Sequence, residues 1–218
     1  MKLVYWGPAG SGKTTCIDTL YMITKEQEKE VAPQGDLTKI SMASGSTLYF
    51  DRGIFQHKTQ KAIFYHIYTV AGQRRFSPLR KQIYGGTDGV IFVWDSQKVR
   101  FEDNLESLRE LKKLSEGRLI KQVPFLVMAN KQDLENTMTK DEIIEVLRSE
   151  GLYYDVKNPL NLWNPQVYET VALKENYRNV YSVFSELARR TALYQVYGSG
   201  SAPVTEKKVK LSDKVPDF

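Results

Sequence analysis

Residues 7–14 read Gly-Pro-Ala-Gly-Ser-Gly-Lys-Thr and directly follow the apolar run 3–6. This G-x-x-x-x-G-K-T spacing is typical of a phosphate-binding loop, because glycines let several backbone N–H groups converge on phosphate oxygens. We expect a helix over roughly 13–25 that directs its positive dipole end at the phosphates, with a charge from Lys13 and a Mg²⁺-binding hydroxyl from Thr14. The predicted nucleotide-binding residues of this loop are Gly7, Gly10, Ser11, Gly12, Lys13, Thr14 and Thr15.

A second motif, Asn130-Lys131-Gln132-Asp133, follows the apolar run 125–128. A carboxylate at the mouth of a strand can accept hydrogen bonds from N1–H and the 2-amino group of guanine, whereas adenine would leave it facing an acceptor nitrogen. We expect Asp133 to select guanine, Lys131 to lie over the base and Asn130 to connect this loop to the phosphate loop. The two motifs together predict GTP.

Apolar runs alternate with amphipathic helical patterns, which is typical of a parallel sheet covered by helices on both faces. We predict six strands, at residues 2–6, 47–51, 63–70, 89–95, 124–129 and 166–171. Apolar stripes predict helices through 101–111 and 180–191, and a capping box at 139–142 begins another. We expect one α/β domain over residues 1–197, followed by a flexible, charged tail at 198–218.

Composition limits the classes of function. The chain has 218 residues and is 41% hydrophobic, enough for one full core. The 31 basic and 26 acidic residues give a net charge of only +5, which gives little support to a nucleic acid partner. The single cysteine, Cys16, excludes an internal disulfide and predicts a packed thiol in a reducing compartment. We find no membrane-length apolar stretch or lipidation pattern and expect a cytoplasmic protein without a direct membrane anchor.

These motifs resemble the Ras superfamily of small GTPases over residues 1–197. The resemblance implies a P-loop NTPase fold, the small GTPase G domain with a six-stranded mostly parallel sheet, and GTP or GDP bound with Mg²⁺. Ala71-Gly72-Gln73 is similar to the second-switch motif, in which Gly72 would contact the γ-phosphate and Gln73 would orient the attacking water. Residues 169–172 resemble the loop whose backbone contacts the guanine oxygen, which assigns that contact to Ala172.

The chain departs from the common pattern at Thr69, which stands where most Ras relatives carry the aspartate of Asp-x-x-Gly. Residues 46–51 and 68–73 are similar to the bacterial gliding-motility polarity GTPases (MglA type) and their archaeal relatives, and residues 93–96 to the Arf-like branch. In this resemblance Thr47 is the first-switch threonine and Asp51 the substitute carboxylate near the metal. A solvated carboxylate paired with Arg52 is the alternative for Asp51. The predicted metal ligands are therefore Thr14, Thr47 and Asp51, and the predicted catalytic residues are Gln73, Lys13 and Thr47.

We expect slow hydrolysis, because the methyl group of Ala9 would crowd the space that Gln73 or a catalytic arginine needs. Polarity-type relatives carry an arginine just ahead of the first-switch threonine, where this chain has Ser46. Candidates for an arginine acting within the chain are Arg52, Arg74, Arg75 and Arg80, although each fits a surface charge better. The other source is a partner protein.

The resemblance implies a molecular switch whose loops at about 34–46 and 74–84 are mobile and are ordered by the γ-phosphate. Effector proteins, a GTPase-activating protein and an exchange factor would be its partners. Two alternatives stay open: a GTP-bound, poorly hydrolysing scaffold or receptor module, against which Gln73 argues, and an ATP-dependent enzyme using Asp95 for magnesium, against which residues 130–133 argue. The oligomeric state and the pathway do not follow from the sequence.

Overall fold

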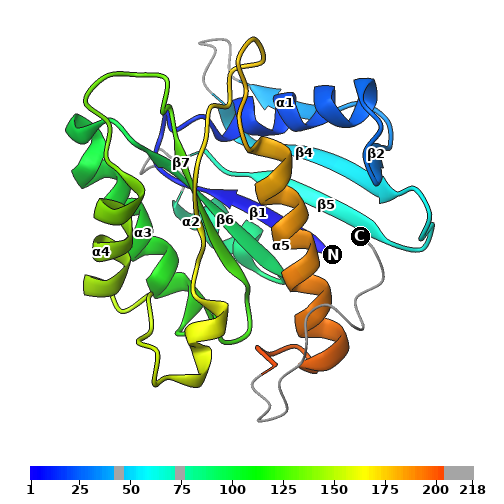
Figure 1. Ribbon diagram of the computed structural model, residues 1–218. Coiled ribbons are helices and arrows are strands. Elements are labelled where there is room, and N and C mark those ends of the chain that lie inside the picture. The colour runs from blue at the N-terminus through cyan, green and yellow to red at the C-terminus, as the bar shows by residue number, and fades with distance from the viewer. Residues whose placement is uncertain (42–46, 72–76, 204–218) are drawn as a thin grey trace.

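The computed structural model is a mixed β-sheet with helices on both faces (Figure 1). It describes residues 1–41, 47–71 and 77–203, with the backbone alone at 39–41, 47–51 and 77–78. The strands are β1 (Lys2–Trp6), β2 (Val31–Pro33), β3 (Thr38–Ser41), β4 (Thr47–His57), β5 (Phe64–Thr69), β6 (Gly89–Asp95), β7 (Phe125–Asn130) and β8 (Val167–Glu169). The helices are α1 (Lys13–Glu26), α2 (Ser77–Tyr84), α3 (Phe101–Ser115), α4 (Lys140–Ser149) and α5 (Val180–Tyr197), with short 3₁₀ turns η2 (Lys98–Arg100) and η3 (Pro159–Trp163).

The strand order is β2-β4-β5-β1-β6-β7-β8, and β3 pairs with β4. All neighbours from β5 to β8 are parallel, whereas β4 is antiparallel to β2, β3 and β5. The carboxyl ends of β1, β6 and β7 therefore meet at one edge of the sheet, where α/β folds bind their ligands. Both predicted nucleotide motifs leave the sheet at this edge.

Two hydrophobic cores lie on opposite faces of the sheet. Along β1, Leu3 and Tyr5 join the core beneath α1 and α5, whereas Val4 and Trp6 join the core on the α3 side. Figure 1 shows α5 crossing one face beside α1. Since both faces are covered, β6 and β7 are buried along their whole lengths, which explains their continuous apolar sequences.

The described sheet has eight strands where the sequence predicted six. The two additional strands, β2 and β3, are short and pair only with β4 at the margin of the sheet. Such strands carry no long apolar run, and Pro33 is tolerated because β2 is an edge strand. The predicted switch regions 34–46 and 74–84 thus include strand β3 and helix α2, while residues 42–46 and 74–76 lie outside the described residues.

The chain continues past α5 in contact with the core. The backbone N–H of Ala202 donates a 2.7 Å hydrogen bond to the carbonyl of Lys121, and Ala202 is buried. Ordered contacts therefore extend beyond the predicted boundary at residue 197, and residues 204–218 of the predicted tail lie outside the described part. Among the described residues, no helix is both long and apolar enough to span a bilayer.

Candidate nucleotide-binding site

The predicted phosphate loop joins the carboxyl end of β1 to the first turn of α1. Lys13 begins α1 and is only 7% exposed. Its Nζ donates to the carbonyl oxygens of Gly7 (2.9 Å) and Pro8 (2.6 Å), so the lysine reaches back across the loop. Thr14 and Thr15 follow in the first helical turn and are partly exposed. The loop is therefore curled around a buried ammonium group at the positive end of a helix.

Two of the loop glycines are required by the protein itself. A Cβ at Gly12 (φ +97°) would lie 2.4 Å from Nδ2 of Asn130, and one at Gly7 would lie 2.3 Å from the carbonyl oxygen of Val93. A Cβ at Gly10 would meet nothing within 4 Å. The sequence predicted all three glycines from the approach of phosphate to the backbone, and neighbouring protein atoms give Gly7 and Gly12 a second reason.

Two side chains near this loop are fully buried. The Ser11 hydroxyl has no hydrogen-bond partner among the described residues, which is uncommon for a buried polar group and fits a site that receives a polar ligand. Burial raises the pKa of the Cys16 thiol to about 12. Cys16 is buried, so the prediction of a packed thiol is confirmed.

The loop 130–133 leaves the carboxyl end of β7 and meets the phosphate loop directly. Nδ2 of Asn130 donates a 2.8 Å hydrogen bond to the carbonyl oxygen of Ser11, and Asn130 is buried. Lys131 has a left-handed backbone (φ +68°) and places its Nζ 2.7 Å from Oδ2 of Asp95. Asp133 is exposed. The two predicted motifs, far apart in the sequence, thus form one continuous site.

A cavity of about 280 Å³ lies between these loops. Its lining residues are Gly10, Gly12, Thr15, Asn130, Lys131, Asp133, Leu134, Ala172 and Leu173. Leu134 and Leu173 are 42% and 48% exposed, and neither was predicted from the sequence. Each directly follows a predicted site residue. An apolar residue at that place in a predicted loop is the signal in the sequence that could have identified both. They offer apolar walls suited to a flat ring.

The loop that carries Ala172 is held against α1. The hydroxyl of Thr19 donates a 2.6 Å hydrogen bond to the carbonyl oxygen of Ala172. On the other side, the backbone N–H of Gln132 donates to the carbonyl of Thr170 at 3.2 Å. Helix α1, the 130–133 loop and the 170–173 loop are therefore fixed to one another around the cavity.

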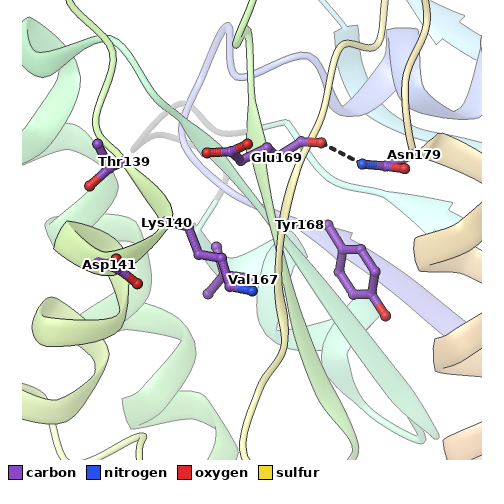
Figure 2. Close-up of a pocket in the computed structure, with 7 residues that line it drawn as sticks. All are labelled: Thr139, Lys140, Asp141, Val167, Tyr168, Glu169 and Asn179. Atoms are coloured by element: carbon purple, nitrogen blue, oxygen red, sulfur yellow. Dashed lines mark hydrogen bonds between the residues drawn. The ribbon is translucent and has the colours of Figure 1, made fainter.

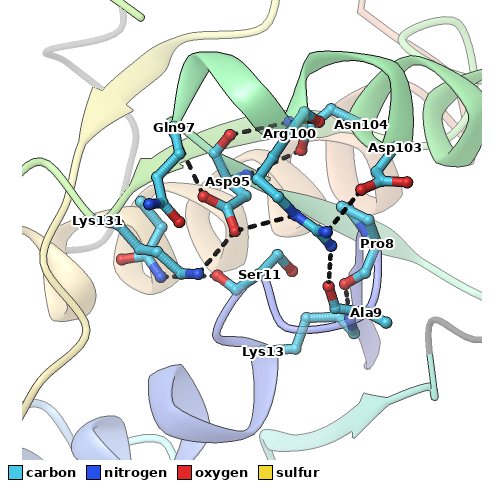
Figure 3. Close-up of polar contacts among 11 residues, drawn as sticks. Pro8, Ala9, Ser11, Lys13, Asp95, Gln97, Arg100, Asp103, Asn104 and Lys131 are labelled. Atoms are coloured by element: carbon cyan, nitrogen blue, oxygen red, sulfur yellow. Dashed lines mark hydrogen bonds and ion pairs between the residues drawn. The ribbon is translucent and has the colours of Figure 1, made fainter. Parts of the chain in front are cut away.

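Asp95, at the end of β6, is engaged by the protein. Its side chain is 1% exposed, and Oδ2 lies 2.7 Å from Nζ of Lys131 and 3.8 Å from Nε of Arg100 (Figure 3). Oδ1 accepts a hydrogen bond from the backbone N–H of Gln97 at 3.3 Å. Two cations thus neutralise this carboxylate, which argues against its use as the magnesium ligand of an ATP-dependent enzyme.

The remaining predicted catalytic and metal residues are largely beyond the described part. Gly72 and Gln73 lie outside the described residues, and Thr47 and Asp51 are described only as backbone, in register with Ser41 and Lys39. No group of three or more His, Cys, Asp or Glu side chains within the described residues could hold a metal ion. The magnesium set therefore stays a prediction.

Of the four candidate arginines, only Arg80 is shown to differ from the expected surface position. Arg74 and Arg75 lie outside the described residues. Arg52 lies over the ring of Tyr68, 5.7 Å from its centroid. Arg80 was expected to be a surface charge, but it is 5% exposed.

Contacts with α3 and with Ala71, two residues after the end of β5, explain why Arg80 is buried. Its Nη2 lies 2.8 Å from Oε1 of Glu110, and its Nη1 donates to the carbonyl of Ala71 at 3.1 Å. Glu110 is 30 residues away, so no local pattern in the sequence could reveal this pair.

A second hollow, of about 450 Å³, lies between the start of α4 and strand β8 (Figure 2). Nδ2 of Asn179 donates to the carbonyl of Glu169 at 2.9 Å on its wall. The hydroxyl of Thr139, also on the wall, caps α4 by accepting from the N–H of Glu142, so the predicted capping box is confirmed. None of the predicted nucleotide-binding residues lines this hollow.

Comparison with known proteins defines the family. A sequence profile of the ADP-ribosylation factor (Arf) family matches residues 1–183. The chain belongs to the Arf family. This confirms the predicted relationship to the Ras-superfamily small GTPases of the Arf-like and MglA-type branch, and with it the predicted fold class, although the sheet has more strands than expected. Arf-family proteins are GTP-binding small GTPases and, in general, GTP hydrolases.

Individual relatives agree with this assignment. The chain is 37% identical over 156 residues to the mutual gliding-motility protein MglA of Myxococcus xanthus, covering 69% of this chain and 77% of that protein. It is 39% identical over 88 residues to human ADP-ribosylation factor-like protein 4A, covering 40% of this chain and 42% of that protein. The Arl6 (BBS3) small GTPase of Trypanosoma brucei, solved with the nucleotide analogue GppNp, shares the fold with a TM-score of 0.62 and 23% identity, over 88% of this chain and 97% of that one.

Proposed function

We propose that this Arf-family protein is a molecular switch that binds GTP or GDP with Mg²⁺ and hydrolyses GTP slowly. One observation carries the proposal: residues of the phosphate loop and of the 130–133 loop line the same 280 Å³ cavity. Asp133 would select guanine, while the backbone around Gly10 and Gly12 would bind the phosphates, with Lys13 supplying charge. The buried hydroxyl of Ser11 supports a polar ligand at this place.

Magnesium fits the chemistry of the proposed donors. The hydroxyls of Thr14 and Thr47 and the carboxylate of Asp51 are oxygen ligands, which Mg²⁺ prefers. When bound, Mg²⁺ would neutralise phosphate charge. Gln73 would orient the attacking water and Gly72 would contact the γ-phosphate, as the family relationship suggests.

Slow hydrolysis rests on the residues around the γ-phosphate position. Ala9 adds a methyl group to the phosphate loop, and among the candidate arginines Arg80 is committed to Glu110 and Ala71, while Arg52 lies over Tyr68. A GTPase-activating protein would then supply the missing charge, and effectors would bind the GTP state. We place the protein in the cytoplasm, with residues 1–197 as the G domain.

The test is single-turnover hydrolysis of GTP and of ATP with Mg²⁺, for the wild type, Gln73→Ala and Asp133→Asn. We expect slow GTP turnover that is lost in Gln73→Ala, no ATP turnover, and GTP binding weakened about 100-fold in Asp133→Asn, because guanine would lose hydrogen bonds to a charged acceptor. Tight GTP binding without turnover would favour the poorly hydrolysing scaffold, and turnover of ATP would contradict both functions.

A further inference from the structure

Arg100 contacts the phosphate loop from outside the cavity. It ends the turn η2 just before α3, and its Nη2 donates a 2.8 Å hydrogen bond to the carbonyl oxygen of Ala9, 91 residues earlier in the chain. Figure 3 shows the guanidinium lying between Ala9 on one side and Asp95 and Asp103 on the other. No sequence motif points to this residue.

The guanidinium is held in place by two carboxylates. Nη1 lies 2.8 Å from Oδ2 of Asp103, and Nε lies 3.8 Å from Oδ2 of Asp95. Nδ2 of Asn104 also donates to the carbonyl of Arg100 at 2.8 Å, which fixes the backbone. Since the guanidinium group is rigid and planar, the contacts of Nη1 and Nε determine the direction of Nη2, which points at the carbonyl of Ala9.

The contact with Arg100 also orients the next peptide group of the loop. In a trans peptide the C=O and N–H groups point in opposite directions, and the described residues contain no cis peptide. With the Ala9 carbonyl directed at Arg100, the N–H of Gly10 is directed away from Arg100. Gly10 lines the nucleotide cavity. A cation bonded to the carbonyl also polarises the peptide, which strengthens its N–H as a donor to an anion.

We propose that Arg100 is a positioning residue for phosphate binding: it acts through the Ala9–Gly10 peptide and touches neither nucleotide nor metal. The inference rests on the proposed function and adds a residue that lies outside the motifs at 7–14 and 130–133. The ion pair with Asp103 does not by itself account for Arg100, because the Arg100 side chain is 35% exposed and that of Asp103 is 47% exposed, and the contact with the buried Asp95 is longer, at 3.8 Å. Ion pairs this exposed contribute little to folding.

The test measures affinity for GDP and for guanosine, which has no phosphate, in the wild type, Arg100→Gln, Arg100→Lys and Arg109→Gln. Arg109 lies on the adjoining helix α3, and its exposed guanidinium pairs with Glu150 at 2.7 Å, so it is a matched control. We expect Arg100→Gln to bind GDP about tenfold more weakly, the usual effect of losing one charge-assisted hydrogen bond, with unchanged guanosine affinity. Arg100→Lys should recover part of the loss, and Arg109→Gln should match the wild type.

Three results would overturn the inference. Unchanged GDP affinity in Arg100→Gln would show that the contact does not position phosphate, and an equal loss for GDP and guanosine would show general damage to the site. Failure of Arg100→Lys to recover any affinity, in a variant whose thermal unfolding matches the wild type, would also contradict it. A wild-type protein that binds neither GDP nor GTP would instead overturn the proposed function, and this inference with it.

Discussion

Nδ2 of Asn130 donates a 2.8 Å hydrogen bond to the carbonyl oxygen of Ser11, across 119 residues of sequence. The same amide nitrogen lies where a Cβ at Gly12 would have to fit, at 2.4 Å. The 130–133 loop and the phosphate loop are therefore packed so closely that they can make this contact only because residue 12 is a glycine and has no side chain. The packing of the two loops can therefore be tested by the stability of the nucleotide-free protein.

Gly12→Ala should destabilise the nucleotide-free protein more than Gly86→Ala. Both glycines have positive φ, +97° and +69°, so both variants carry left-handed strain of about 1–2 kcal/mol. A Cβ at Gly86 would meet nothing within 4 Å, whereas Gly12→Ala must also displace Asn130 and lose its hydrogen bond, at a further cost of about 1–3 kcal/mol. Urea unfolding measures the difference. Equal losses in the two variants would show that the loops can separate at no cost.

Asp95→Asn should lower stability without changing the magnesium requirement. The substitution removes the carboxylate that lies 2.7 Å from Nζ of Lys131, and we expect a loss of about 1–3 kcal/mol. Because Lys131 and Arg100 already engage Asp95, the Mg²⁺ concentration that supports half-maximal nucleotide binding should stay at the wild-type value. A titration with Mg²⁺ checks this. A marked rise in that Mg²⁺ concentration would indicate that Asp95 binds the magnesium ion.

Glu110→Ala should be strongly destabilising, by about 3–5 kcal/mol, because it removes a carboxylate that lies 2.8 Å from a buried guanidinium. The Arg80 side chain is 6% exposed and that of Glu110 is 24% exposed. Glu145→Ala is the control, since Glu145 pairs with Arg148 where both side chains are largely exposed, and it should cost less than about 1 kcal/mol. Thermal unfolding distinguishes the two, and a small loss in Glu110→Ala would mean that Arg80 can reach solvent.

Glu186 should make stability depend on pH in the acid range. Burial alone would raise the pKa of its carboxyl, but hydrogen bonds from Arg189 and Arg190 outweigh burial and lower the pKa below the usual 4.5. The stabilisation is therefore complete above about pH 4.5 and is lost as the pH falls through the lower pKa of the folded state. Glu186→Gln loses the charged hydrogen bonds with the two arginines, so it should be about 2 kcal/mol less stable than the wild type at pH 7. Because the variant cannot titrate at this position, the difference in unfolding free energy between wild type and variant should narrow below pH 4.5. Urea unfolding of both proteins, measured from pH 7 downwards, tests this. A stability difference that widens in acid would show that the pKa of Glu186 is raised in the folded state, not lowered.

The sequence by itself determined the features that are encoded locally. The phosphate loop and the 130–133 motif are short, contiguous segments, so their residue types point to their chemistry without knowledge of their neighbours. The long amphipathic helices α3 and α5 and the capping box of α4 are local in the same sense, because helical periodicity and caps act within a few residues. The family followed from these motifs.

Tertiary structure decided what depends on partners distant in the sequence. The short strands β2 and β3 form only because β4 offers its backbone to them, and no periodic signal fits into three or four residues. The burial of Arg80 and the contact of Arg100 with Ala9 are set by elements 30 and 91 residues away. From the sequence alone, a charged side chain is expected to be exposed. Only the fold shows that Arg80 contacts the carboxylate of Glu110 and that Arg100 contacts the carbonyl of Ala9.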